Sequence, residues 1–148
     1  MLAVERRAPT DGAIRDFEVV PSRSRARPPD SDLTVRMLDY AYQFEGRWSG
    51  GSHRERIENA GTEAHEFDPY RLEPGKRPDD FFRWIESGRP GPPPAKPLGG
   101  SGTFVPGRRI WLPLRLTPGR YFAFCEMPAR VGGQPHYRMG MVREFEVK

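Results

Sequence analysis

Short segments in which apolar and polar residues alternate recur along much of the chain. Leu33, Val35 and Met37 are separated by polar residues, and a period of two is typical of a strand with one buried face. The segment that ends at Asp39 is therefore a predicted strand. Stronger or weaker forms of the pattern predict further strands at 54–59, 65–72, 109–116, 121–125 and 142–147. We therefore expect an all-β domain.

Two of the predicted strands contain proline, which cannot donate a hydrogen bond to a sheet ladder. Pro69 and Pro113 therefore predict a sheet edge or a bulge at each position. Segment 54–59 is rich in charged residues, and we predict a polar edge strand there. The turn Thr117-Pro118-Gly119 is typical of a hairpin and is expected to join the strands on either side.

One short helix is predicted between the strands. Pro78 followed by two aspartates suits a helix start, because proline has a fixed φ and negative charge is favourable at the N-terminus. Four apolar residues between 81 and 85 supply a buried side, and Ser87-Gly88 ends the helix. The proline-rich stretch 89–102 then predicts an extended surface loop.

The composition suits one modest domain. The chain has 148 residues, of which 17 are proline and 16 are glycine, so turns and loops make up much of it. Hydrophobic residues are 36% of the total and the mean hydropathy is −0.75, which indicates that part of the chain lies outside any core. The first 32 residues are rich in arginine and proline and have few large apolar side chains. We therefore expect a flexible arm at 1–32 and a domain at 33–148.

The chain is basic, with a net charge of +4 and a pI near 9.6. Its basic residues are scattered and alternate with acids, as at 53–58, whereas nucleic-acid-binding surfaces cluster them among aromatic residues. We therefore expect no nucleic-acid partner, although the arginine-rich arm suits docking to an acidic redox partner. No segment has the ~18 apolar residues of a membrane span, and the first residues lack the apolar region of a secretory signal.

The reactive and metal-binding side chains are one cysteine, two of the histidines and two methionines. Cys125 is the single cysteine, which excludes an internal disulfide. His136 and Met141 follow it, and His65 lies upstream. Two imidazoles, one thiolate and one thioether suit an ion that cycles between Cu(I) and Cu(II). Met139 is a second candidate thioether, and each of these side chains is also compatible with an ordinary core or surface position.

The carboxylates beside one histidine bear on its charge. Glu63 and Glu66 flank His65 in the sequence. A nearby negative charge favours the imidazolium form, so we expect these residues to raise the pKa of His65 when no metal is bound. The alternative interpretation is a surface histidine beside acidic residues.

The C-terminal part of the chain carries a family resemblance. Residues 118–125 have the sequence Pro-Gly-Arg-Tyr-Phe-Ala-Phe-Cys, and residues 135–142 have the pattern Pro-His-x4-Met-Val. Over 33–148 the chain resembles the cupredoxins, which have the plastocyanin-type fold, and in particular the actinobacterial cupredoxin-like proteins. The resemblance implies a Greek-key β-sandwich, to which the short helix and the long Pro/Gly-rich loops are added.

The same resemblance implies a function. His65, Cys125, His136 and Met141 would form a type 1 site for one copper ion, and the protein would transfer electrons to a redox partner protein. Members of the family are usually extracytoplasmic. In such a site the thiolate carries the electronic coupling, the imidazoles fix the plane and the thioether tunes the potential.

One departure from the family concerns the spacing between two of these residues. In plastocyanin two residues separate the cysteine from the second histidine, whereas here ten do, 126–135. The glycine pair 132–133 permits a tight reversal, which would return His136 to Cys125. Without that reversal, the chain would keep the fold and lose the ion.

Other functions stay open at this point. A metal-free cupredoxin-like interaction module would keep Cys125 in its core, and a copper carrier would use Met127 and Met139. A Cys/His protease would use Cys125 with His65 or His136, and a structural zinc site would use the cysteine with two histidines. The sequence lacks the Gly-x-Ser-x-Gly, phosphate-loop and His-Glu-x-x-His motifs, and we therefore expect no enzymatic activity.

Overall fold

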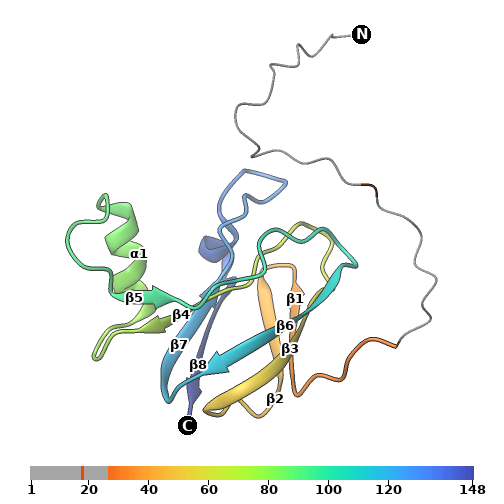
Figure 1. Cartoon of the computed structure of the whole chain (residues 1–148). Helices are drawn as coiled ribbons and strands as arrows, with labels where there is room; N and C mark the ends of the chain where they lie inside the picture. Colours follow the sequence, from red (N-terminus) through yellow and green to blue (C-terminus); the bar gives the residue numbers. More distant parts are fainter. Residues whose placement is uncertain (1–17, 19–26) are drawn as a thin grey trace.

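The computed structural model of the chain describes residue 18 and residues 27–148. Most of the predicted arm at 1–32 therefore lies outside the described residues. The rest forms two packed sheets, with one α-helix and a short 3-10 helix (Figure 1). The elements in chain order are β1 (Leu33–Leu38), β2 (Ala41–Gly46), β3 (Gly51–Asn59), β4 (Asp68–Leu72), α1 (Pro78–Glu86), β5 (Ala95–Pro97), β6 (Arg109–Leu116), β7 (Gly119–Phe124), η1 (His136–Met139) and β8 (Val142–Val147).

Each sheet has four strands. The first has the order β2-β1-β3-β6, in which β1 and β3 are parallel and the other neighbours are antiparallel. The second has the order β5-β4-β7-β8 and is antiparallel throughout. The connections from β3 to β4 and from β6 to β7 change sheets, as in a Greek key. The predicted β-sandwich with one short α-helix is confirmed.

The core lies between the sheets and follows the predicted alternation in β1. Leu33, Val35 and Met37 are at most 1% exposed, and burial of each such side chain stabilises the fold by about 1.5–3 kcal/mol. Val35 and Met37 belong to the same buried cluster as Cys125 and Met141. The hydrophobic core of the sandwich therefore reaches two of the predicted ligands.

The predicted edge strand at 54–59 is wrong. It is the second half of β3, which lies inside its sheet between β1 and β6. Its inward positions are Glu55, Ile57 and Asn59, each at most 2% exposed. Because two of these three inward residues are polar, the sequence shows no alternation of apolar and polar residues that would indicate a buried strand.

The two prolines behave differently from one another. Pro113 lies in β6, an edge strand, as predicted. Pro69 lies opposite Ala123 within β4, which has neighbours on both sides, so the expected edge is wrong there. The β4–β5 ladder ends one residue away, and the carbonyl of Pro69 accepts a hydrogen bond from the Leu98 N–H at 2.9 Å. Pro69 has no N–H group to donate, but it lies beyond the end of the β4–β5 ladder, so no hydrogen bond of that ladder is lost.

Two short strands were not predicted. β2 has an alternating Tyr42 and Phe44, but it is only six residues long and begins straight after the turn at 39–40. β5 interrupts the predicted loop at 89–102 with three residues. Strands this short depend on their partners in the sheet more than on their own sequence.

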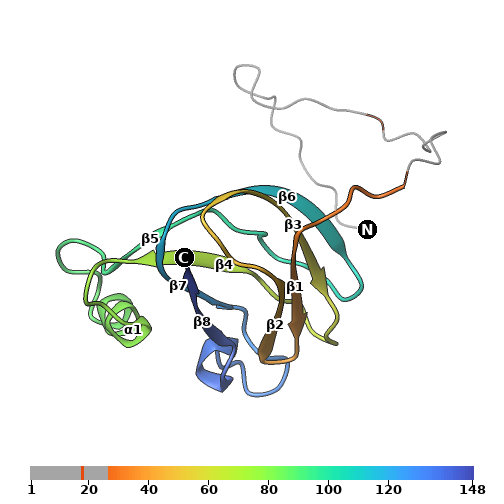
Figure 2. The ribbon, with the colours of Figure 1, turned by 90° about the horizontal axis from the view of Figure 1, so that it is seen from below.

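Helix α1 confirms the predicted start and end. The Asp80 carboxylate accepts the N–H of Arg77 at 2.9 Å, and Gly88 follows the helix with a φ of 85°. Phe81 is buried against the second sheet. Figure 2 shows α1 beside the β4 and β5 edge, away from β1 and β2. No helix among residues 27–148 is long and apolar enough to cross a membrane.

Four segments of the chain meet at one end of the sandwich. They are the β1–β2 turn, the β3–β4 connection, the segment 126–135 after β7, and η1 (Figure 1). Side-chain contacts link all four, including Asp39 to His65 and Cys125 to His136. The predicted ligands lie at this end.

Glu55 offers a test of the fold. Its side chain is buried, and no other described residue offers its Oε1 atom a hydrogen bond. Burial raises the pKa of Glu55 from 4.5 to about 7. The folded protein therefore binds this proton more tightly than the unfolded chain does. The resulting stability is complete below about pH 4.5 and is lost as the pH rises through about 7.

We expect the free energy of unfolding to fall by roughly 2–3 kcal/mol more in the wild type than in Glu55→Gln between about pH 5 and pH 8. Urea unfolding at both pH values measures this difference. Glu45→Gln, at an exposed position of β2, is the matched control and should keep the wild-type dependence. Equal pH dependence in the wild type and Glu55→Gln would contradict the prediction.

Candidate metal centre

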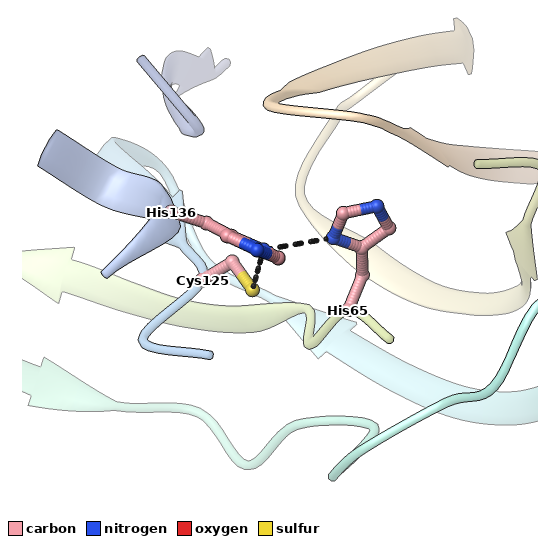
Figure 3. A group of neighbouring side chains, drawn as sticks. All are labelled: His65, Cys125 and His136. Carbon is pink, nitrogen blue, oxygen red and sulfur yellow. Dashed lines mark hydrogen bonds between the residues drawn. The ribbon is translucent and has the colours of Figure 1, made fainter. Parts of the chain in front are cut away.

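Three potential ligand atoms converge from three separate segments. His65 lies in the β3–β4 connection, Cys125 follows β7 directly, and His136 is the first residue of η1. The Nδ1 atoms of the two histidines are 3.1 Å apart, and the Cys125 Sγ atom is 3.4 Å from the Nδ1 of His136 (Figure 3). All three ligand atoms lie within 4.8 Å of one another. The arrangement is that of a site for one small cation.

The ten-residue segment 126–135 returns the chain to the site. The glycine pair 132–133 has φ values of 82° and 67°, which reverse the direction of the chain. The N–H of His136 then donates to the carbonyl of Met127 at 2.9 Å. The predicted reversal therefore brings His136 beside Cys125 despite the longer spacing.

Carboxylates bind the outer nitrogen of both imidazoles. Asp39 Oδ1 lies 2.9 Å from the Nε2 of His65, and Glu63 Oε2 lies 3.4 Å from the Nε2 of His136. A carboxylate accepts a hydrogen bond from the Nε2–H group, so the neutral form of each ring has its lone pair on Nδ1. The two lone pairs then point at one another and at the thiol, an arrangement that a shared proton or a cation relieves.

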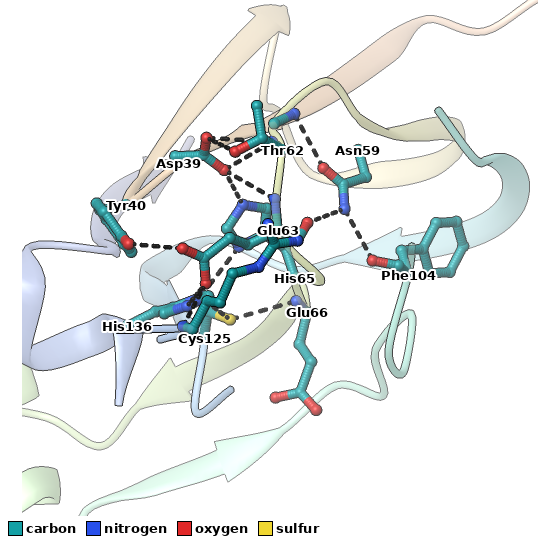
Figure 4. Close-up of polar contacts among 12 residues, drawn as sticks. Asp39, Tyr40, Asn59, Thr62, Glu63, His65, Glu66, Phe104, Cys125 and His136 are labelled. Carbon is teal, nitrogen blue, oxygen red and sulfur yellow. Dashed lines mark hydrogen bonds and ion pairs between the residues drawn. The ribbon is translucent and has the colours of Figure 1, made fainter. Parts of the chain in front are cut away.

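Asp39 is anchored by the chain that leads to His65. It accepts hydrogen bonds from the Thr62 N–H at 2.8 Å and hydroxyl at 2.7 Å, and from the Glu63 N–H at 3.2 Å (Figure 4). Burial acts to raise the pKa of Asp39, but these bonds and the one to His65 outweigh it and hold the pKa well below its usual range. Asp39 is therefore a fixed negative partner for His65.

The environment of His65 differs from the prediction. Its side chain is fully buried, and this burial, together with the nearby His136, lowers its pKa, although the hydrogen bond to Asp39 and the charges of Asp39 and Glu63 act to raise it. The Glu66 side chain turns away, to the Thr103 hydroxyl at 3.2 Å and the Glu126 N–H at 3.3 Å. The expectation of a raised pKa is therefore wrong. The neutral imidazole is the form that binds metals.

The sulfur of Cys125 is buried and weakly hydrogen-bonded. The Glu66 N–H lies 3.4 Å from Sγ, and burial raises the pKa of the Cys125 thiol to about 11. Without a metal the side chain is therefore a thiol and not a reactive thiolate. A bound metal deprotonates such a ligand, because the cation replaces the proton.

A buried asparagine braces the connection that carries His65. The Asn59 side-chain N–H₂ group donates to the carbonyls of Glu63 and Phe104, both at 2.8 Å, and its oxygen accepts the Gly61 N–H at 3.0 Å. His65 also exchanges two backbone hydrogen bonds with Phe104, at 3.0 and 2.8 Å. The position of His65 is therefore set by the backbone on both sides.

Gly61 is required by close packing. A Cβ atom there would lie 2.5 Å from Asp39 Oδ1 and 2.7 Å from the Nε2 of His65. Cβ atoms essentially never lie within 3.0 Å of such a neighbour, so the absence of a side chain at Gly61 makes room for the Asp39–His65 pair.

The two candidate thioethers lie in different environments. Met141 is fully buried in the same core cluster as Cys125, whereas Met139 is 41% exposed. The Met141 N–H donates to the His136 carbonyl at 3.0 Å, and the Met141 carbonyl accepts from the Cys125 N–H at 3.3 Å. Of the two, Met141 has the backbone contacts and the burial of a site residue. Its axial role stays a prediction.

Sequence analysis missed the contribution of the β1–β2 turn, which is the two residues Asp39 and Tyr40. Tyr40 has a φ of 64°, a left-handed conformation that is uncommon for a tyrosine. Its hydroxyl donates to Glu63 Oε1 at 2.9 Å, and its ring meets the His136 ring edge-on with centroids 5.1 Å apart. The predicted strand ended at Asp39, and nothing in the sequence there indicated that the side chains of Asp39 and Tyr40 point at the histidines.

Comparison with known proteins supports the architecture. No family model and no curated protein matches the sequence. Among solved structures, the chain is similar to Na-dithionite-reduced auracyanin from the photosynthetic bacterium Roseiflexus castenholzii, with a TM-score of 0.53 and 20% identity over 78% of this chain and 94% of that one. It is also similar to auracyanin B, with a TM-score of 0.51 and 18% identity over 78% of this chain and 86% of that one.

Likeness at these identities concerns the fold. The two sheets, their order and the position of the cluster at one end agree with the resemblance found in the sequence, while the closer likeness to actinobacterial members stays a prediction. The protein has a cupredoxin-like fold, with two histidines and a cysteine gathered at one end of the sandwich.

Proposed function

We propose that the protein binds one copper ion through His65 Nδ1, Cys125 Sγ and His136 Nδ1, with Met141 as an axial ligand. In this role it passes single electrons to a redox partner protein. The observation that carries the proposal is the direction of the two imidazoles. Each is bound by a carboxylate at Nε2, so that two Nδ1 lone pairs and one sulfur face the same point.

The donor set suits copper better than zinc. Thiolate, thioether and imidazole are the ligands of electron-transfer copper sites, in which the thioether lies on a long axial bond. A structural zinc site takes four nitrogen or sulfur ligands of the cysteine and histidine type, and here the fourth side chain is Met141. A bound copper ion would supply the one-electron chemistry of the site.

The chain itself supplies rigidity. His65 is held by the backbone bridge to Phe104 and by Asp39, and the reversal at 132–133 fixes His136. Cys125 and Met141 are embedded in the hydrophobic core. A site that is held this firmly before an ion binds changes little in geometry between oxidation states, which favours fast electron transfer.

Burial weighs against the other functions. All four proposed ligands are fully buried: His65, Cys125, His136 and Met141. A copper carrier needs ligands that the receiving protein can reach, because the ion passes directly from one protein to the other. Of the two methionines predicted to serve a carrier, Met127 packs against the core, and Met139 is exposed. A cysteine protease needs an accessible thiolate, and the raised thiol pKa opposes one. We therefore propose no enzymatic activity.

The first test is addition of Cu(II) to reduced, metal-free protein. We expect an intense visible band and a narrow copper hyperfine splitting in electron paramagnetic resonance at about one equivalent. Cys125→Ser should lose the intense band completely, because the band comes from the thiolate, while far-ultraviolet circular dichroism stays that of the wild type. A colourless wild type, or an intense band that survives in Cys125→Ser, would contradict the proposal.

The second test addresses the Asp39–His65 pair. Gly61→Ala places a Cβ against both side chains, and we expect copper affinity to fall by about tenfold or more, the usual effect of disturbing a partner of a metal ligand. Competition with a chelator measures the affinity. Gly50→Ala is the matched control, since Gly50 also has no positive φ and lies beside Pro118 instead. Equal affinities in the two variants would show that the pair does not position His65.

A further inference from the structure

One carboxylate at the site contacts three segments of the chain. Glu63 Oε2 accepts the N–H of Arg130 at 2.8 Å and lies 3.4 Å from the Nε2 of His136. Glu63 Oε1 accepts the hydroxyl of Tyr40 at 2.9 Å (Figure 4). The partners belong to the ten-residue segment, to η1 and to the β1–β2 turn. Glu63 therefore joins parts of the site that are far apart in the sequence.

Glu66 and Thr103 hold the start of the segment at Glu126 and Met127, and the hydrogen bond from Arg130 secures its tip, 128–134. Among the described residues, the other backbone hydrogen bonds of 128–134 stay within the segment, from Ala129 to Gln134 at 2.8 Å and from Gly133 to Ala129 at 3.2 Å. These bonds shape a hairpin-like excursion but do not attach it to the sandwich. The bond from the Arg130 N–H to Glu63 provides that attachment.

His136 lies beneath this attachment. Its side chain is fully buried although it begins a short helix at the end of the molecule. The Tyr40 ring covers it edge-on, and the Glu63 carboxylate lies against its Nε2 atom. The outer edge of the ring is therefore closed to solvent. A carboxylate at this position also fixes the orientation of the ring, so that the opposite nitrogen is the one that would face the metal.

We propose that Glu63 is a positioning residue that clasps the segment 126–135 over His136 and orients the His136 ring for the metal. This inference rests on the proposed function. One side chain fixes the ring and keeps small molecules from its outer edge. An electron-transfer partner would therefore meet the clasped segment, where Val131 is 85% exposed at the tip, instead of the bare imidazole.

The clasp is tested first in the metal-free protein, by hydrogen exchange of single amides observed by nuclear magnetic resonance. Arg130 has an exposed side chain, yet its amide is bonded to Glu63. Glu63→Ala should speed exchange at this amide by about tenfold or more, because loss of the acceptor frees the donor. Glu63→Gln keeps an oxygen that accepts the bond and should stay within about threefold of the wild type.

Glu66 supplies the matched control. Its carboxylate accepts the Glu126 N–H at 3.3 Å, at the start of the same segment, and does not contact Arg130 or His136. Glu66→Ala should speed exchange at Glu126 and leave Arg130 unchanged. An Arg130 amide that exchanges equally fast in the wild type and in Glu63→Ala would overturn the clasp.

The effect on the ring is tested in the copper-loaded protein. Loss of the charge in Glu63→Gln should weaken Cu(II) relative to Cu(I) by about tenfold, which raises the midpoint potential by about 59 mV. Glu63→Ala should in addition let azide change the visible spectrum, whereas the wild-type spectrum stays unchanged. A potential and an azide response that match the wild type in both variants would overturn the positioning role.

The copper site and the role of Glu63 can be disproved independently of one another. A wild type that forms no blue site would contradict the proposed function and the positioning role, while exchange at Arg130 would still decide whether Glu63 clasps the segment. A blue wild type with an unchanged Glu63→Ala would contradict the inference about Glu63 and leave the copper site in place. Unchanged thermal unfolding of the variants would exclude a general loss of structure.

Discussion

The close approach of two imidazoles controls the organisation of this end of the molecule. The Nδ1 atoms of His65 and His136 face each other at 3.1 Å, and carboxylates bind the opposite nitrogens. Two lone pairs this close repel unless a proton or a cation lies between them. The surrounding structure has to hold both rings in place against that repulsion. The left-handed backbone of Tyr40, for example, places its ring against the ring of His136.

The rings are held by hydrogen-bonded polar groups, of which Asn59 is buried and Asp39 is half-buried. Asn59 bonds two backbone groups of the connection before His65 and the carbonyl of Phe104, and Asp39 accepts from two residues of the same connection. A buried polar group without a partner would destabilise the fold by about 1–3 kcal/mol. Because these groups are paired, the sandwich can place histidines at the end of its hydrophobic core without losing stability there. Glu55, further down β3, is the contrasting case, because its Oε1 has no partner among the described residues.

Alternation predicted β1, where the inward positions are apolar. Strands β6, β8 and most of β7 were predicted as well, although the residues from Tyr121 to Phe124 in β7 are all buried and do not alternate. The same pattern led to the prediction of β3 as an edge strand, because Glu55 and Asn59 are polar although they point inward, and Ile57 is the one apolar residue among the three inward positions. The choice of His65, Cys125 and His136 followed from residue chemistry and from the family resemblance, and the structure brings these three together. Asp39 and Tyr40 were missed, because a two-residue turn contains no periodicity from which their direction can be inferred.

The sequence by itself determined most of the strands, though not the short β2 and β5, as well as where the helix begins and ends and which side chains are available to a metal. These properties depend on neighbours within a few residues. Only the tertiary structure decided that the ten-residue spacer closes, that His65 is neutral and that Glu63 spans the site. The two histidines are 71 positions apart, and their separation, burial and hydrogen-bond partners arise from the packing of two sheets. The pKa of His65 shows the difference, because the neighbouring Glu63 acts to raise it, while the burial and the approach of His136 that folding creates lower it.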